Sequence, residues 1–373
     1  MKLLVCVSEY YPHGAGIANV AYYVVSQLQK MGVDCTICSP TGPDIKISSN
    51  SVIGRYGRLG LLYYWHKVAT YFQKETNKYD AVWLHNPIFP GHNPFLKSLV
   101  TMHVTSYEKT SHRKCPLHLY LYYKLSSVVE KRSLNKVALS SLNTRFTAVS
   151  SHVSEELTKI GIVPEKITYI SNGVDTRKFK PSDYKKDLRK KYNLPEDERI
   201  LLSLGRLTEA KQPYQLIEVF SSIEKNSKGI TLVVAGDGEL LVGARKLATR
   251  KGLNKVRFMG YLDHNKAVPD LYSCADYYIM TSKFEGQPLT LLEAMAAGLP
   301  CIVSDIPALR VVKQAKCGIV VDFNNAETAA SQIIEYLVKD NTNHSRNARE
   351  YAVSNLDWET VARRYLEEFK KLM

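Results

Sequence analysis

Two glutamates in the segment FEGQPLTLLEAMAAGLP, Glu285 and Glu293, stand eight positions apart. Pro288 suits the first turn of a helix and Gly298 suits the position that ends one, so the pattern predicts a helix over 289–297. Glu285 then lies in the preceding loop and Glu293 in the second helical turn. Because the free N–H groups at such a helix end favour anions, carboxylates beside them indicate a ligand with both phosphates and hydroxyls.

A phosphate ligand also needs cations, and the segment LLSLGRLTEAK offers two. Gly205 closes a predicted strand, and Arg206 and Lys211 follow it in a loop and an early helix. A guanidinium can bind two phosphate oxygens at once, and an ammonium supplies a point charge. Taken alone, an exposed Arg and Lys usually belong to a solvated helix face, and both interpretations stay open at this point.

A glycine-bearing loop follows the first predicted strand, in SEYYPHGAGIANV. Gly14 and Gly16 flank Ala15 ahead of an amphipathic stretch, and glycine lets the backbone approach a phosphate or sugar closely. The third glycine of the dinucleotide-binding fingerprint is missing, so a plain turn between strand and helix is the alternative.

Two histidines of the first half each end a predicted strand, His85 in VWLHNP and His103 in LVTMHVT. Strand ends of parallel sheets line ligand clefts, so either histidine could face a substrate. The alternative for both is a hydrogen-bonded structural histidine. No group of residues has the spacing of metal ligands.

Short apolar runs alternate with amphipathic stretches of helical period along the chain. The first series extends from LLVCVS to FTAVS and the second from ILLSLGR to GIVVDF. This alternation predicts an α/β fold of two doubly wound parallel sheets with a ligand cleft between them. We expect domains over 1–168 and 169–355, and an amphipathic helix in 356–373 that packs back on the first domain.

The 373 residues are enough for two cores. We expect neither a secretory leader nor a membrane span, because the first apolar run is short and no apolar run is long enough to cross a bilayer. We therefore expect a cytoplasmic protein. Its seven cysteines are scattered, and the pair Cys35 and Cys38 lies in a predicted buried strand. Core thiols are expected, not a redox pair or a disulfide framework.

The formal net charge is +14, and residues 1–170 hold 19 Lys and Arg against 10 Asp and Glu, which gives +9 there and leaves +5 for the rest. Such an excess fits nucleic acid, an anionic membrane surface or a phosphorylated substrate. Segments 55–67 and 113–132 place Tyr, Trp and Leu between basic flanks, which suits an anionic bilayer. Helices that bury these aromatics in the core are the alternative.

In this order the motifs resemble the GT-B nucleotide-sugar glycosyltransferases of the large retaining family often called GT4. The resemblance covers nearly the whole chain. It rests on E-x7-E at 285–293, G-R-x(4)-K at 205–211, N-G-V-D at 172–175, and the segments AGDGEL, VRFMGYL and EAMAAGLPCIVSD.

The resemblance implies a retaining transfer of a hexose-type sugar from a UDP-, GDP- or ADP-sugar, without a metal or another cofactor. Arg206 and Lys211 would neutralise the diphosphate leaving group, and Glu293 would accept hydrogen bonds from the ribose hydroxyls. Glu285 would hold hydroxyls of the donor sugar, and His103 would lie beside that sugar.

Further contacts are implied by the same resemblance. The backbone near Tyr261 would meet the base, and the loop around Gly14, with the amides of Ala15 and Gly16, would face a phosphate or the acceptor. The other donor-binding positions are Gly236, Gly286, Gln287, Leu289 and Thr290.

Three departures from the family pattern bear on substrate identity more than on the chemistry. Gln-Pro at 287–288 replaces the usual Phe-Gly, and because proline has no N–H, Leu289 and Thr290 would have to supply the amides. Ala15 stands in place of the first glycine of a Gly-Gly pair. A Glu often found after CIVSD is absent.

Three hypotheses for the function remain. The first is a glycosyltransferase that extends a lipid-linked or envelope glycan at the inner face of the cell membrane. The second is the same chemistry on a soluble acceptor, such as a sugar phosphate. The third is a non-catalytic nucleotide-sugar or nucleic-acid binder. The paired cations and glutamates argue against it, and the sequence contains no known nucleic-acid-binding motif. A glycosidase would leave the nucleotide-binding features without a role.

Overall fold

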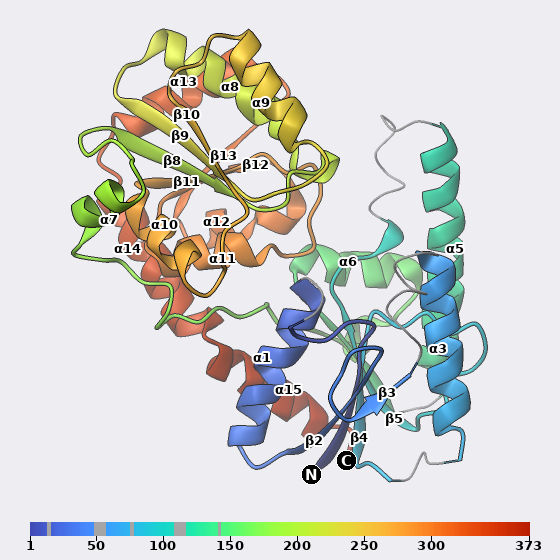
Figure 1. Cartoon of the computed structure of the whole chain (residues 1–373). Helices are drawn as coiled ribbons and strands as arrows, with labels where there is room; N and C mark the ends of the chain where they lie inside the picture. The colour runs from blue at the N-terminus through green and yellow to red at the C-terminus, as the bar shows by residue number, and fades with distance from the viewer. Residues whose placement is uncertain (13–15, 48–56, 75–77, 108–116, 141–142) are drawn as a thin grey trace. The chain divides into compact units, whose positions relative to one another are not determined.

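The chain folds into two compact units in a computed structural model. The structure describes residues 1–12, 16–47, 57–74, 78–107, 117–140 and 143–373. The first unit combines Met1–Gly173 with Trp358–Met373, and the second is Val174–Asp357. The chain therefore leaves the first unit once and returns to it for its last helix. Each unit has a parallel sheet of its own (Figure 1). Buried hydrophobic residues pack against each sheet.

The first unit is built on a seven-stranded sheet in the order β3-β2-β1-β4-β5-β6-β7, with parallel neighbours throughout. The strands are β1 (Lys2–Cys6), β2 (Asp34–Ser39), β3 (Ile45–Lys46), β4 (Ala81–His85), β5 (Lys97–Met102), β6 (Asn143–Ala148) and β7 (Ile167–Tyr169). The central strands are apolar along most of their length because helices bury both faces of the sheet. Cys35 and Cys38 of β2 are both buried, which confirms the prediction of core thiols.

Helices cover the two faces of this sheet. Buried side chains of α3 (Arg58–Phe72), α5 (Leu117–Ser140) and α6 (Ser151–Ile160) share one core with β1, β4, β5 and β6. On the other face, α1 (Gly16–Lys30) packs against α15 (Trp358–Lys370). A short 3-10 turn, η1 (Pro164–Lys166), precedes β7. In the described part of the chain, no helix is both long enough and apolar enough to cross a membrane.

The C-terminal segment belongs to the core of the first unit. Its apolar residues at helical spacing are all buried: Trp358, Val361, Tyr365, Phe369 and Leu372. The Trp358 ring stacks on Tyr23 of α1 at 5.2 Å, and a Cβ atom placed on Gly173 would lie 2.3 Å from the same ring. On the polar side of the helix, Arg145 of β6 donates to Glu368 at 2.8 Å.

The second unit has a six-stranded parallel sheet in the order β10-β9-β8-β11-β12-β13. The strands are β8 (Arg199–Leu204), β9 (Ile230–Ala235), β10 (Val256–Gly260), β11 (Tyr277–Met280), β12 (Cys301–Ser304) and β13 (Gly318–Val321). The strand order changes direction between β8 and β11. In such sheets the crevice outside the carboxyl ends of these two strands is where ligands bind.

Successive strand residues point to opposite faces, so this sheet separates two cores. Helices α8 (Pro213–Asn226), α9 (Leu241–Arg250) and α13 (Ala326–Leu337) cover one face, and α10 (Ala267–Cys274), α11 (Leu289–Ala296), α12 (Val311–Gln314) and α14 (Thr342–Tyr351) cover the other (Figure 1). The remaining elements are α7 (Lys185–Lys191), the 3-10 turns η2 (Glu209–Lys211) and η3 (Pro307–Leu309), and a π-helical turn, η4 (Ala352–Leu356). The predicted α/β fold with two doubly wound sheets is confirmed.

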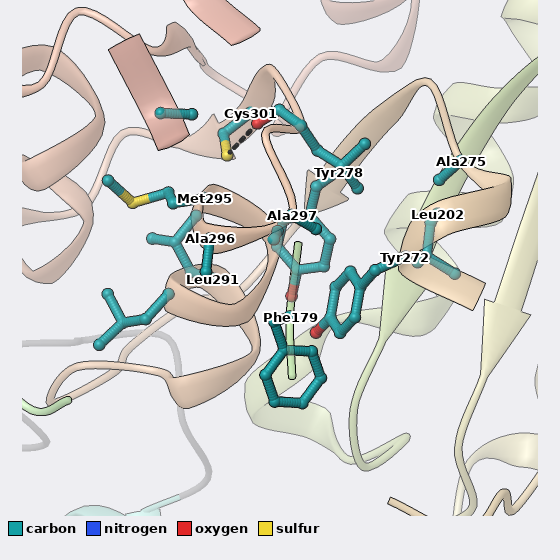
Figure 2. Packing of buried hydrophobic residues seen from close by; sticks show 14 of the residues in the cluster. Phe179, Leu202, Tyr272, Ala275, Tyr278, Leu291, Met295, Ala296, Ala297 and Cys301 are labelled. Carbon is teal, nitrogen blue, oxygen red and sulfur yellow. Dashed lines mark hydrogen bonds between the residues drawn. The ribbon is translucent and has the colours of Figure 1, made fainter. Parts of the chain in front are cut away.

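The core below α11 packs aromatic rings next to small residues. Figure 2 shows Phe179, Tyr272 and Tyr278 close to the helix residues Leu291 and Met295. The rings of Phe179 and Tyr272 meet edge to face at 5.6 Å, an arrangement that aromatic pairs favour. This packing fixes α11 against the sheet and therefore fixes where its first turn points.

We expect Trp358→Ala to lower the free energy of unfolding of the first unit by about 3 to 5 kcal/mol, because a nearly buried indole leaves a cavity between α1 and Gly173. Urea unfolding measures the change. Leu139→Ala, at a side chain that is 86% exposed, is the control and should alter stability by no more than about 0.5 kcal/mol. Equal effects of the two substitutions would contradict this account of the C-terminal helix.

Candidate active site

Glycines shape the loops that follow β8 and β9 in the second unit. Gly236 has a φ of 128°, and a Cβ atom on it would lie 1.9 Å from the Gly205 carbonyl oxygen. Gly238 meets the Leu207 carbonyl oxygen in the same way, at 2.5 Å. The two loops therefore pack backbone against backbone. This close approach requires glycine at position 236, and the donor-binding role of Gly236 stays a prediction.

A cavity of about 490 Å³ opens beside these loops. Arg206, Gly236, Tyr261 and His264 are among the residues that line it. Tyr261 follows β10 and is 78% exposed, and Arg206 is also exposed. No side-chain partner holds the Arg206 guanidinium within the described ranges, so this cation can bind a ligand without first breaking an ion pair.

Lys211 and Glu285 come from different loops and meet as an ion pair. Lys211 ends η2, Glu285 lies between β11 and α11, and Nζ donates to Oε1 at 2.5 Å. Two anchors fix the lysine backbone, since Thr281 Oγ1 donates to the Lys211 carbonyl at 2.9 Å and Lys283 N–H donates to Ala210 at 2.8 Å. Oε2 of Glu285 has no hydrogen-bond partner in the part of the chain that the structure describes, so it can still accept.

Glu293 is buried in α11, and both oxygens of its carboxylate are occupied. His264 Nε2 lies 2.7 Å from Oε1, and the Tyr272 hydroxyl lies 3.0 Å from Oε2 and 2.9 Å from the Thr290 carbonyl oxygen. A carboxylate only accepts, so the imidazole Nε2 carries a proton here. Burial raises the pKa of Tyr272 well above its usual value and the Glu293 charge adds to this, which keeps the hydroxyl a donor.

The first turn of α11 is the remaining part of this site. The helix begins at Leu289, with Pro288 as its N-cap residue and no side chain capping it. Leu291 N–H donates to the Pro288 carbonyl at 3.2 Å, which leaves the amides of Leu289 and Thr290 without an acceptor in the helix. The Thr290 hydroxyl is turned to Tyr278, whose OH donates to it at 2.9 Å. Gln287 is buried, whereas Gly286 is partly exposed. The predicted helix 289–297 is confirmed to within one residue.

His85 and His103 meet in the first unit. His85 Nδ1 lies 3.0 Å from His103 Nε2, and both side chains are buried. Burial lowers the pKa of His103 to about 3, and burial together with His103 lowers the pKa of His85 well below its usual value. Gly16 begins α1 and is exposed, while Gly14 and Ala15 lie outside the described residues.

Sequence reasoning missed His264 and Tyr272. His264 lies in a loop after a strand, and Tyr272 resembles an ordinary core aromatic of an amphipathic helix. No sequence pattern therefore marked either residue as a partner of Glu293. Among the described residues, no group of three or more His, Cys, Asp and Glu side chains could hold a metal ion.

The second unit is thus a doubly wound α/β unit with cations, carboxylates and free helix amides at its switch point. Two protein-family models match the chain, Glycosyltransferase Family 4 over residues 14–178 and Glycosyl transferases group 1 over residues 184–354. The chain belongs to the GT4-type glycosyltransferases, and the family resemblance read from the sequence is confirmed.

Two curated relatives match parts of this chain. UDP-Gal:alpha-D-GlcNAc-diphosphoundecaprenol alpha-1,3-galactosyltransferase of Escherichia coli is 31% identical over 175 residues, 46% of this chain and 45% of that protein. GDP-mannose-dependent alpha-(1-6)-phosphatidylinositol monomannoside mannosyltransferase of Mycobacterium tuberculosis (strain ATCC 25618 / H37Rv) is 30% identical over 228 residues, 58% of this chain and 59% of that protein. The matches therefore span less than two thirds of either relative.

Among solved structures, the crystal structure of WaaG, a glycosyltransferase involved in lipopolysaccharide biosynthesis, is similar over 98% of both chains. The TM-score is 0.76 at 19% sequence identity, so the similarity bears on the fold alone. The predicted GT-B fold is confirmed.

We expect Tyr272→Phe to lower the free energy of unfolding of the second unit by about 1 to 3 kcal/mol, because Glu293 Oε2 stays buried without its donor. Urea unfolding is again the measurement. Tyr214→Phe removes the hydroxyl of an exposed tyrosine and serves as the matched control. An unchanged midpoint in Tyr272→Phe would mean that this hydroxyl does not support the carboxylate.

Proposed function

We propose that this protein is a retaining glycosyltransferase that moves a hexose-type sugar from a nucleoside diphosphate sugar to a lipid-linked or envelope glycan, without an essential metal. The observation that carries the proposal is the meeting of Lys211 and Glu285 at the switch point of the second sheet, beside the first turn of α11. This places a cation and a hydroxyl acceptor together, as a sugar diphosphate requires.

In the proposed reaction, charge separates between the sugar and the diphosphate of the donor as the bond between them breaks. The bond between the anomeric carbon and the phosphate oxygen breaks, and its electron pair leaves with the nucleoside diphosphate. The anomeric carbon bonds to an acceptor hydroxyl oxygen, and the proton of that hydroxyl passes to the departing phosphate oxygen. Arg206, Lys211 and the amides of Leu289 and Thr290 stabilise the charge that develops on the leaving group.

The carboxylates serve the neutral parts of the donor. Glu285 keeps Lys211 in place through Oε1 and can accept from sugar hydroxyls through Oε2. Glu293, fixed by His264 and Tyr272, accepts from the ribose hydroxyls. The cavity lined by Gly236 and Tyr261 takes the base. The two curated relatives use UDP-Gal and GDP-mannose by their names, which leaves the base of this donor to experiment.

The acceptor proposal rests on two helices of the first unit. Arg58 at the start of α3 pairs with Glu130 of α5 at 3.7 Å. Leu121, Leu125 and Val128, spaced four and three apart on α5, are exposed on one helical face. Leu59 and Tyr63 of α3 are exposed as well. Apolar side chains flanked by basic residues fit an anionic bilayer, and this favours a lipid-linked acceptor at the cytoplasmic face of a membrane.

Release of the nucleoside diphosphate tests the proposal, measured with UDP-, GDP- and ADP-sugars, each with and without a lipid extract. Release from one donor that is stimulated by lipid supports it. Stimulation by a soluble sugar phosphate in place of lipid overturns the acceptor part. No release from any donor sugar overturns the enzymatic proposal and favours a nucleotide-sugar binder.

We expect Arg206→Ala and Lys211→Ala each to lower kcat by roughly a hundredfold or more, because each removes a cation that stabilises the leaving group. Steady-state kinetics with the active donor measures this effect. Arg250→Ala, at an exposed cation in the last turn of α9, is the matched control and should leave kcat unchanged. Near-normal rates in Arg206→Ala and Lys211→Ala would remove this account of the chemistry.

We expect the protein to sediment with anionic vesicles at low salt and to be released at high salt, because screening weakens its attraction to the surface. The double variant Leu121→Glu/Leu125→Glu should bind vesicles much more weakly, since it places carboxylates on the exposed face of α5. Val163→Glu changes an exposed valine outside both helices and is the control. Indifference of the unsubstituted protein to vesicles would count against a membrane acceptor.

A further inference from the structure

The two buried histidines of the first unit form a closed pair. Their rings are nearly parallel, at 14°, with centroids 5.3 Å apart, and the His85 ring also packs on Trp83 at 4.2 Å. His85 is 1% exposed and His103 is 7% exposed. The backbone N–H of His103 donates to Asn86 Oδ1 at 2.8 Å, which fixes the chain just after β5.

The register of the sheet explains why the rings meet. β4 and β5 are parallel neighbours, and His85 pairs with Thr101. His103 follows Thr101 by two residues, so the side chains of His103 and Thr101 lie on the same face of the sheet, which is also the face of His85. Each histidine ends or follows its strand, and this places the pair at the carboxyl edge of the first sheet.

Both rings are neutral at physiological pH because burial disfavours the imidazolium form, and the pKa of each ring is lowered accordingly. A neutral imidazole carries one N–H and one bare nitrogen. The 3.0 Å hydrogen bond therefore has one donor and one acceptor, and two arrangements are possible.

The surroundings of His85 choose between these arrangements. If His103 Nε2 donated, His85 would carry its proton on Nε2, which is buried and has no hydrogen-bond partner within the described parts of the chain. A buried N–H without a partner is rarer and costlier than a bare acceptor nitrogen. The favoured arrangement has His85 Nδ1–H donating to His103 Nε2.

We propose that His85 is a positioning residue that holds His103 in the tautomer protonated on Nδ1. With Nε2 of His103 engaged by His85, Nδ1–H is the ring group left for a ligand, and it is a donor. His103 then orients an acceptor oxygen of the ligand, such as a sugar hydroxyl or phosphate oxygen, and does not take up a proton. The assignment of a sugar ligand to His103 rests on the proposed function.

The tautomer itself can be measured without any substrate. The full chain is labelled with 15N in its histidine rings, and two-bond 1H–15N correlations are recorded at neutral pH, with His103→Gln used to assign the signals. The account predicts that His103 has the pattern of a neutral ring protonated on Nδ1. A pattern for protonation on Nε2, or for an imidazolium, would overturn it.

Two substitutions of His85 test its effect on His103. Asparagine can place an N–H donor near the position of His85 Nδ1, whereas leucine cannot. We expect His85→Leu to remove the preference for Nδ1 at His103 and to lower kcat/KM by about tenfold, as loss of one hydrogen bond allows. His85→Asn should keep the tautomer and most of kcat/KM, and loss of both in His85→Asn would overturn the positioning role.

The two readouts separate this inference from the proposed function. If no donor in the panel is turned over, the proposed function fails while the tautomer measurement still decides the role of His85. If His85→Leu does not fold, the spectra of the unsubstituted protein and of His85→Asn remain decisive. If His103 is still protonated on Nδ1 in a folded His85→Leu variant, His85 does not set the tautomer of His103.

Discussion

The reversal of strand order between β8 and β11 is the constraint on which the rest of the second unit depends. Because β8 lies between β9 and β11, the chain leaving β8 and the chain leaving β11 serve opposite faces of the sheet. The loop after β8 carries Arg206 and Lys211, and the loop after β11 carries Glu285 and leads into α11. Residues 74 positions apart therefore meet at 2.5 Å.

The negative charges of the two glutamates are stabilised in different ways. Glu285 is paired with a cation, so its charge is balanced before any ligand arrives. Glu293 is buried and accepts from Tyr272 and from the imidazole of His264, which satisfies both of its oxygens. In the proposed donor complex, ribose hydroxyls that bind Glu293 would share or replace the His264 contact, which would add to the free-energy cost of binding.

Much of this arrangement could be predicted from the sequence because it is local. Proline before α11 and glycine after it define the helix, and the spacing of the two glutamates then fixes which precedes it and which lies inside. Apolar runs without polar alternation predict the buried strands of parallel sheets. The helical spacing of apolar residues in the last segment predicts α15. These signals lie within a few residues of the feature that they predict.

The rest depends on contacts between distant segments. His264 and Tyr272 are 29 and 21 positions from the carboxylate that they hold, and no spacing rule links them to it. Gly236 was predicted to bind the donor from its motif alone, and only the structure shows that its φ and its approach to Gly205 require glycine there. His85 and His103 were weighed separately as strand ends, and only the register of β4 against β5 joins them.

We propose that the second unit holds a diphosphate through Arg206, Lys211 and the first turn of α11. Calorimetry tests it most directly, first with UDP, GDP and ADP, and then with the monophosphate that matches the tightest binder. The account predicts that the diphosphate binds at least about tenfold more tightly than the monophosphate, since the second phosphate gains charge-assisted hydrogen bonds. It also predicts that Lys211→Ala removes most of that difference. Equal affinities for diphosphate and monophosphate in the unsubstituted protein would contradict the claim.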